Sequence, residues 1–339
     1  MKKRITRGDV ARMAGVSEST VSRALNNSPR ISEEVKERVR NTAAHLGYVP
    51  NHQAVLLARN KTFRIGLVVK TYKSFSPFSR SYFPRLLDGV LVNAEKHGYS
   101  VTVVMDKAGE VYKDLSLLVR AREVDGLIFS VTASDDSRFN DLKKQQIPFV
   151  LTNNLLEEHY CVNCNSSVGM GDAFSHAAGL GHVNIGYISG DSDYYDGVER
   201  LKIFKEISAE YGIKYKIVNG NFSKTGGYKA AGTLLGSAEP PSLIMCASDR
   251  SAMGVIEYCK QNRIKIPEDL SVIGFDNLGP ARDMVPGLTT VHNPVTRIGS
   301  VAMDVLAAIL AGKHPEQHHF VDSGFIIRES TGVNRFSEI

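Results

Sequence analysis

From residue 64 onward, short runs rich in β-branched residues alternate with longer stretches whose apolar residues follow helical spacing. A helix is expected between most of the strands, for example over 84–97. Strand–helix alternation predicts parallel sheets that are covered by helices on both faces. The expected strands span residues 64–69, 100–105, 125–130, 148–152, 184–189, 214–218, 243–246 and 271–275.

Eight strands are many for one sheet, and we expect a connection near 161–165 to divide them four and four. The prediction is two similar α/β lobes with a cleft between them, where the C-terminal ends of the strands gather ligand-binding groups. A late helix over 294–310 and a strand over 320–328 are expected to cross back between the lobes.

Length and composition exclude several classes of protein. The 339 residues exceed what one core usually holds, and 42% hydrophobic with 23% charged residues is typical of globular proteins. No apolar run approaches the roughly 18 residues of a membrane-spanning helix, and no apolar segment follows the charged N-terminus as in a secretory signal. Four cysteines are too few for a disulfide framework. We therefore expect a cytoplasmic protein with no membrane association.

The positive charge is concentrated at the N-terminus. Residues 1–61 contain twelve lysines and arginines against five aspartates and glutamates, a formal charge of +7, whereas the whole chain carries +5. The other 278 residues therefore carry −2. A small basic module attached to a nearly neutral body indicates binding to a polyanion such as nucleic acid.

Three short helices are expected in this basic segment. Thr6, Ser17 and Ser32 each stand where a hydroxyl can cap a helix N-terminus, and Gly15 and Gly47 stand at the turns that end the first and third helices. Two helices joined by a glycine-containing turn and followed by a packing helix predict a helix-turn-helix. A three-helix protein-interaction module is the alternative.

The second of these helices has a short polar face. Glu18, Ser19, Ser22 and Arg23 lie one turn apart in pairs, so all four side chains can point into a major groove. Arginine pairs with guanine O6 and N7, and glutamate accepts from cytosine N4. Other hydroxyl and amide groups suit DNA phosphates, which position a helix without reading sequence: Thr6, Ser17, Asn26 and Ser32.

Residues 51–58 have the pattern of one or two helical turns, which is too short to be stable alone in water. Val55, Leu56 and Leu57 follow one another, so an ordering partner is needed. A symmetry mate and DNA are the expected partners, since apolar side chains inserted into a minor groove kink the duplex. A linker helix packed on the next domain is the alternative.

The N-terminal stretch closely resembles the DNA-binding headpiece of the lactose/galactose repressor (LacI/GalR) family. The run DVARMAGVSESTVSR over 9–23 is similar to its helix-turn-helix signature, and YVPN with the hinge residues Ala54 and Leu57 follows at the family's spacing. The resemblance implies that Glu18, Ser19 and Arg23 read bases and that Leu57 enters the operator centre. It also implies a homodimer on a pseudo-palindromic double-stranded DNA operator.

The rest of the chain is similar to the core of the same family, which has a type I periplasmic-binding-protein fold. The matching stretches are GHVNIGYISG, IPEDLSVIGFDN, PGLTTVHNP, IGSVAMDVL and IIRES. The predicted fold class is thus an all-α helix-turn-helix headpiece (1–50), a hinge (51–61) and a two-lobed α/β core (62–339). The N-lobe is expected over 62–161 and 292–320, and the C-lobe over 162–291 and 321–339.

The resemblance also implies a small, sugar-like effector in the cleft. Arg200, Asp276, Phe222 and Ser248 match effector-contact positions of the family, and Asn153 stands where acidic residues are frequent. A guanidinium and a carboxylate offer donors and acceptors to a hydroxyl-rich ligand, and an aromatic face covers the sugar C–H surface. A salt bridge between the lobes or core packing is the alternative for each residue.

An aromatic-rich insertion follows the first strand. It is either a lid over the pocket or a locally packed surface loop, and Tyr82 and Phe83 are its candidate effector contacts. The aromatic residues of the insertion are Tyr72, Phe75, Phe78, Tyr82 and Phe83.

Signals for other chemistry are weak. His159, Cys161 and Cys164 lack a fourth zinc ligand at a recognisable spacing, and no phosphate-loop, serine-hydrolase or zinc-protease motif occurs. We expect no metal, no cofactor and no enzymatic activity. A solute-binding receptor with no role on DNA is the main rival function, and an α/β enzyme is a further one.

Overall fold

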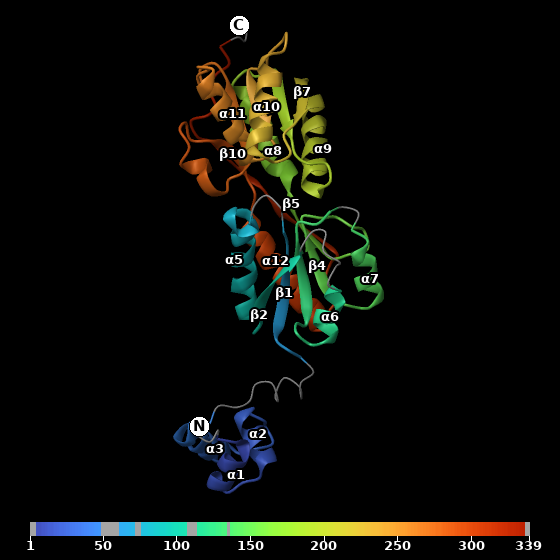
Figure 1. The fold of residues 1–339 in the computed structure, drawn as a ribbon, viewed down its shortest axis with the longest axis vertical. Helices are drawn as coiled ribbons and strands as arrows, with labels where there is room; N and C mark the ends of the chain where they lie inside the picture. Colours follow the sequence, from blue (N-terminus) through green and yellow to red (C-terminus); the bar gives the residue numbers. More distant parts are fainter. Residues whose placement is uncertain (1–4, 49–60, 72–75, 107–113, 134–135, 336–339) are drawn as a thin grey trace. The chain divides into compact units, whose positions relative to one another are not determined.

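The computed structural model describes residues 5–48, 61–71, 76–106, 114–133 and 136–335. It divides into two compact units, Met1–Lys61 and Thr62–Ile339 (Figure 1). The predicted hinge, with Ala54 and Leu57, lies outside the described residues except for Lys61. Tyr72 and Phe75 of the aromatic insertion lie outside them as well.

The first unit, which we call the headpiece, is a bundle of α1 (Arg7–Ala14), α2 (Glu18–Leu25) and α3 (Glu33–Leu46). The predicted N-caps are confirmed, and the first is a capping box in which the side chains of Thr6 and Asp9 bond each other's backbone amides. Gly15 ends α1 at φ +64°, a conformation that glycine adopts without strain. The helices share a small core that includes fully buried Val10, Val21 and Val39.

The second unit, the core unit, contains two six-stranded sheets, one in each lobe. The first sheet, in the order β11-β5-β4-β3-β1-β2, is parallel throughout. Its strands are β1 (Arg64–Lys70), β2 (Ser100–Asp106), β3 (Gly126–Ser130), β4 (Phe149–Thr152), β5 (Cys161–Asn165) and β11 (His318–Asp322).

The second sheet, in the order β12-β10-β9-β8-β6-β7, is parallel except for β12, which runs antiparallel to β10. Its strands are β6 (Asn184–Ser189), β7 (Lys214–Asn219), β8 (Leu243–Cys246), β9 (Ser271–Asp276), β10 (Thr289–His292) and β12 (Gly324–Ile326). The two-lobed α/β class predicted from strand–helix alternation is confirmed.

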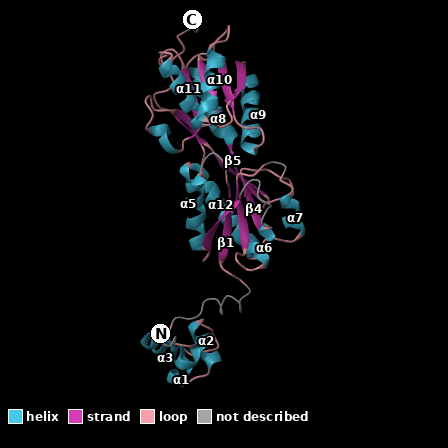
Figure 2. Cartoon of the chain, viewed as in Figure 1, coloured by secondary structure: helices cyan, strands magenta, loops and turns pink. Residues whose placement is uncertain are grey.

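Helices cover both sheets, as Figure 2 shows. In the ranges that the structure describes, none of them is both long and apolar enough to cross a membrane. The first lobe has α5 (Tyr82–Lys96), α6 (Leu115–Arg120), α7 (Arg138–Lys144), α12 (Val295–Leu310) and the short 3-10 turn η1 (Pro77–Ser79). The second lobe has α8 (Ser166–Gly179), α9 (Tyr195–Glu210), α10 (Lys224–Leu235), α11 (Asp249–Gln261) and η2 (Gly279–Arg282).

Three details of the predicted topology were wrong. The expected connection at 161–165 is strand β5, whose buried Asn163 is tolerated because its amide bonds the backbone of Asn154 at 2.9 and 3.0 Å. Strand β10 was not predicted, and the single strand expected over 320–328 is two strands in different sheets. The chain passes between the lobes at Ser323, whose hydroxyl bonds Asn165 O at 2.7 Å. The predicted lobe limits at 161 and 320 therefore fall within β5 and β11.

Helices α5 and α12 pack closely through two glycines. A Cβ at Gly89 would lie 1.8 Å from Thr296 O, and one at Gly299 would lie 2.3 Å from Leu86 O. Only glycine permits this approach of one helix backbone to another. The contact joins an early helix to a late one and so closes the first lobe.

Replacement of Gly89 by alanine therefore has a predictable cost. Gly89→Ala should lower the free energy of unfolding by about 1–3 kcal/mol, because the backbone must move to admit the methyl group. Gly171→Ala is the matched control, since a Cβ at this α8 position meets nothing within 4 Å; it should raise stability by about 0.5–1 kcal/mol. Urea unfolding of both variants measures the difference, and equal effects would contradict the packing.

Candidate functional site

Helix α2 presents the predicted polar face to solvent. Val21 and Ala24 are buried in the headpiece core, whereas Glu18, Ser19 and Arg23 are exposed. Ser22 is half-buried on the same helix. The structure thus brings the candidate base-reading side chains together on one outward surface.

Two of these side chains already have hydrogen-bond partners. Glu18 accepts from Arg7 Nε at 3.0 Å, and the hydroxyl of Ser19 lies 2.8 Å from that of Ser17. The exposed guanidinium of Arg23 makes no ion pair or hydrogen bond within the part of the chain that the structure describes. Arg23 is therefore the side chain of this face that can bind a new acceptor without breaking a contact.

The candidate phosphate contacts also have structural roles. The hydroxyls of Thr6, Ser17 and Ser32 cap the three headpiece helices by accepting from backbone amides at 3.3, 3.1 and 3.4 Å. Asn26 donates to Ser22 O at 2.8 Å at the end of α2. Capping places three of these side chains at helix N-termini, where backbone amides and the helix dipole attract anions.

A cavity of about 640 Å³ lies between the two lobes of the core unit. Six of the seven predicted effector residues line it: Tyr82, Phe83, Arg200, Phe222, Ser248 and Asp276. The seventh, Asn153, is 1% exposed and lies behind the wall. The other lining residues are Ser79, Arg80, Ser81, Val131, Asp191, Tyr194, Asp196, Asn221, Ser223, Asp249, Arg250, Met253 and Leu278.

Arg200 of α9 is the buried cation of this cavity. Its guanidinium is 3% exposed, donates to Ala247 O at 2.7 Å and lies 3.5 Å from both Asp276 Oδ1 and Asp196 Oδ2. Its central carbon lies 3.6 Å from the centroid of the Phe275 ring. These contacts hold the guanidinium at the end of β9, because a buried charge needs partners on several sides.

Three carboxyl groups, those of Asp196, Asp276 and Glu199, lie around this cation, and a fourth, Asp249, lies beside Asp276. Burial raises the pKa of Asp276, although Arg200 opposes the rise. Burial and then the neighbouring Asp276 raise the pKa of Asp249, whose oxygens accept from Thr290 Oγ1 at 2.6 Å and from the Leu278 amide at 3.2 Å. Burial also raises the pKa of Glu199 to about 7. Asp196, Asp249 and Asp276 line the cavity, whereas Glu199 does not. The cavity wall thus offers carboxyl oxygens as acceptors and, where burial keeps a carboxyl group protonated, a donor.

Residues at the ends of the strands have a backbone conformation that is rare for side chains other than glycine. Val131 follows β3 at φ +49°, Asn153 follows β4 at +55°, and Asp276 ends β9 at +122°. Phe222, beyond β7, has φ +49°. Its ring packs directly on Gly190, because a Cβ added to that glycine would lie only 2.0 Å from the nearest ring carbon. Such conformations cluster at binding sites, where the surrounding fold holds them.

The aromatic insertion divides between the wall and the core. Phe83 is 5% exposed and packs in a hydrophobic cluster that contains residues of both lobes, with its ring centroid 6.4 Å from that of Phe78. The Tyr82 hydroxyl donates to Asn153 Oδ1. Tyr82 thus fits the lid interpretation, and Phe83 fits local packing.

Ser248, another of the predicted effector residues, has a structural role as well. Its side chain caps α11 by accepting from the Ser251 amide at 3.2 Å.

Sequence reasoning missed several residues of the cavity wall, notably Asp191, Tyr194 and Asp196. Asp196 had a readable signal, because it lies one helical turn before Arg200 and pairs with it. Tyr194 had none, since its partner Lys70 lies in the other lobe.

The soft-metal candidate does not assemble. Cys161 and Cys164 are buried thiols, and the His159 ring packs with its centroid 5.6 Å from that of Phe149. Across the described ranges no group of three or more His, Cys, Asp or Glu side chains is placed to hold a metal ion.

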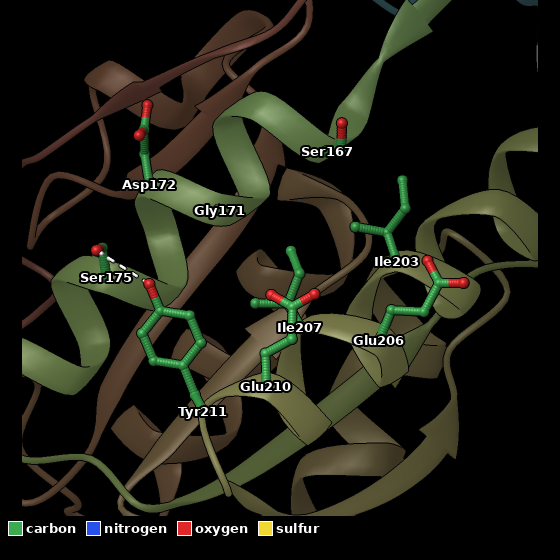
Figure 3. Close-up of a pocket in the computed structure, with 9 residues that line it drawn as sticks. All are labelled: Ser167, Gly171, Asp172, Ser175, Ile203, Glu206, Ile207, Glu210 and Tyr211. Carbon is green, nitrogen blue, oxygen red and sulfur yellow. Dashed lines mark hydrogen bonds between the residues drawn. The ribbon is translucent and has the colours of Figure 1, made fainter.

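A second hollow, of about 490 Å³, lies between α8 and α9 on the surface of the second lobe (Figure 3). The hydroxyls of Ser175 and Tyr211 lie 3.2 Å apart beside it. Its carboxylates, from Asp172, Glu206 and Glu210, are exposed. Because water solvates these groups, the hollow lacks the desolvated polar side chains that mark the cavity between the lobes.

Comparison with known proteins supports a DNA-binding module joined to a ligand-binding core. Residues 6–51 match the model of the bacterial regulatory proteins of the lacI family, and residues 174–331 match that of a periplasmic binding protein-like domain. The chain is 32% identical over 331 residues to the HTH-type transcriptional repressor PurR of Photobacterium profundum, covering 95% of this chain and 97% of that one.

Solved structures agree with this fold. The lac repressor dimer bound to operator and the anti-inducer ONPF superposes with a TM-score of 0.84 at 22% identity, over 97% of this chain and 100% of that one. The transcriptional regulator CelR in complex with cellobiose gives 0.73 at 26% identity, over 96% and 100%. The family match of residues 6–51 and the full-length relative define the class, a transcriptional regulator with an effector-binding core. The chain belongs to the lacI family of bacterial regulatory proteins.

The raised pKa of Glu199 predicts a pH dependence of stability. A carboxyl group whose pKa rises from 4.5 to about 7 on folding binds its proton more tightly in the folded state. Stability is therefore greatest below the ordinary value and falls as the pH rises through about 7. Glu199→Gln removes this loss. Between pH 4.5 and 8, the free energy of unfolding of the variant should therefore rise relative to that of the wild type by on the order of 1–3 kcal/mol.

Urea unfolding across that pH range measures the difference. The control is Glu206→Gln on the same helix, where the carboxylate is exposed. A Glu199→Gln difference as flat with pH as that of the control would contradict the buried carboxyl group.

Proposed function

We propose that the chain is a cytoplasmic transcriptional repressor, without enzymatic activity, that binds a pseudo-palindromic operator as a homodimer under the control of a small polar ligand. The observation that carries the proposal is the pairing, in one lacI-family chain, of a basic helix-turn-helix with a buried, polar cavity between two lobes. The proposed division is a headpiece over 1–50, a hinge over 51–61 and an effector-binding core over 62–339.

The headpiece reads DNA through α2. Arg23 binds a guanine in the major groove, and Glu18, Ser19 and Ser22 complete the base-reading face. The four polar side chains at the helix ends contact phosphates: Thr6, Ser17, Asn26 and Ser32. Ala54 and Leu57 of the hinge belong to this proposal on the sequence resemblance alone, with Leu57 inserted at the operator centre.

Dimerisation is supported by an exposed apolar face on the first lobe. Leu91 and Val92 of α5 are 45% and 54% exposed, and Val103 and Met105 of the edge strand β2 are 38% and 44% exposed. Helix α5 packs against β2, so the four side chains extend over one neighbourhood. Contiguous apolar surface of this kind marks protein interfaces, and a second copy completes the symmetry that a palindromic operator requires.

The cleft takes a neutral, hydroxyl-rich ligand such as a sugar. Tyr82, Arg200, Phe222, Ser248 and Asp276 supply donors, acceptors and an aromatic face around it. A structural relative was solved with cellobiose and another with ribose. Three arginines and four aspartates line the cavity, and burial raises the pKa of two of these aspartates, Asp249 and Asp276. The charges of the lining therefore nearly balance, which suits a neutral ligand.

Two observations argue against the rival functions, namely the presence of the headpiece and the absence of catalytic motifs from the sequence. A solute-binding receptor has no use for a headpiece with a formal charge of +7 and three capped helices. The sequence contains no phosphate-loop, serine-hydrolase or zinc-protease motif that would favour an α/β enzyme.

Replacement of Arg23 tests the DNA-reading face. With a duplex obtained by selection from a random library, Arg23→Ala should reduce the preference for the selected site over random DNA by about 5- to 150-fold, the worth of one bidentate base contact. Arg12→Ala is the matched control, since Arg12 is an exposed arginine on α1, away from that face. Fluorescence anisotropy at fixed salt measures both ratios. Equal losses in the two variants would contradict the assignment of α2.

A thermal-shift screen of sugars and nucleosides on the full chain tests the cleft, because a ligand that binds the folded state raises its melting temperature. For any compound that stabilises the wild type, Phe222→Ala should weaken binding about tenfold, which corresponds to 1.4 kcal/mol of lost stacking. Phe320→Ala, at a half-exposed ring of β11, should leave the affinity unchanged. Unchanged affinity in Phe222→Ala would place the ligand elsewhere.

A further inference from the structure

The first residues of α9 and its N-cap connect the two lobes directly. Lys70 is the last residue of β1 in the first lobe, and its ammonium donates to the hydroxyl of Tyr194 at 2.7 Å. The same ammonium lies 4.7 Å from the centroid of the Tyr194 ring. A hydrogen bond and a cation–π contact therefore join one charged side chain to one ring across the cleft.

Two further contacts reach the same turn of the second lobe. Ala133, just beyond β3, forms an antiparallel β-bridge with Tyr194. Asn153, just beyond β4, donates to Asp196 Oδ2 at 2.7 Å. Three strand ends of the first lobe thus attach to residues 194–196 of the second lobe.

These contacts also bear on the ligand-binding cation. Asp196 accepts from Asn153 and lies 3.5 Å from the guanidinium of Arg200. When the lobes are in contact, the side-chain amide of Asn153 therefore holds the carboxylate of Asp196 in place, and this carboxylate in turn positions Arg200. When they separate, Asp196 loses one of these two partners.

We propose that Lys70 and Tyr194 form an interlobe clasp that holds the cleft closed in the absence of ligand and thereby positions Asp196 and Arg200. A ligand that prefers the closed lobes then binds a state that is already populated, so its apparent affinity depends on the clasp. The clasp does not depend on which ligand binds or on any role of the headpiece. Its test is therefore separate from that of the proposed function.

The separation of the lobes is measured on the full chain by electron–electron double resonance between spin labels. The cysteines of the chain are buried, so labels attach at Lys144→Cys in α7 and Lys229→Cys in α10, where both lysines are exposed. Lys70→Met removes the ammonium and both of its contacts. Tyr194→Phe removes only the hydrogen bond and leaves the ring. Tyr228→Phe is the control, because the Tyr228 hydroxyl donates to Gln261 Oε1 at the same 2.7 Å but within the second lobe.

Each labelled chain is diluted with an excess of unlabelled chain, so that distances within one copy dominate the signal. Without any added ligand, the doubly labelled parent and its Tyr228→Phe variant should then give the same single distance distribution. In Lys70→Met, the ratio of separated to closed lobes should rise about tenfold, so that a second distance becomes visible. A tenfold change is the usual contribution of a hydrogen bond to a charged group. Tyr194→Phe should shift the ratio in the same direction by less. Distributions identical to the wild type in both clasp variants would overturn the proposal, as would an equal change in Tyr228→Phe.

Discussion

The buried guanidinium of Arg200 is the constraint on which the ligand-binding core depends. A charge at 3% exposure is tolerated only when its surroundings replace water. Here the carbonyl of Ala247, the carboxylates of Asp276 and Asp196 and the ring of Phe275 do so. Because these groups come from the ends of β8 and β9 and from α9 itself, the one cation fixes the cavity-facing edge of the second lobe.

Local chemistry was readable from the sequence, and contacts between distant residues were not. The capping hydroxyls of Thr6, Ser17 and Ser32 were predictable because each acts on an amide three residues away. Arg200 and Asp276 were found through the family resemblance. Tyr194 was missed because its partner lies 124 residues away, and the break at Ser323 was missed because only the tertiary crossing between lobes interrupts that strand.

The structure combines a three-helix headpiece that has its own core with a two-lobed unit whose lobes are joined by both apolar and polar contacts. The headpiece is fixed by its own caps and core. In the core unit, one hydrophobic cluster contains side chains of both lobes, and polar contacts from Lys70, Ala133 and Asn153 meet at the start of α9. A ligand in the cavity touches both lobes, so its binding energy can change the balance between two arrangements of them.

If the cleft controls the headpiece, ligand and operator must change each other's affinity by the same factor. The direct measurement is the dissociation constant of the full chain for its selected operator, at fixed salt, with no ligand and with a saturating stabilising sugar. The affinity should change by at least about fivefold, and operator should change the sugar's affinity equally. Operator affinities that are identical with and without a sugar proven to fill the cleft would contradict ligand control of DNA binding.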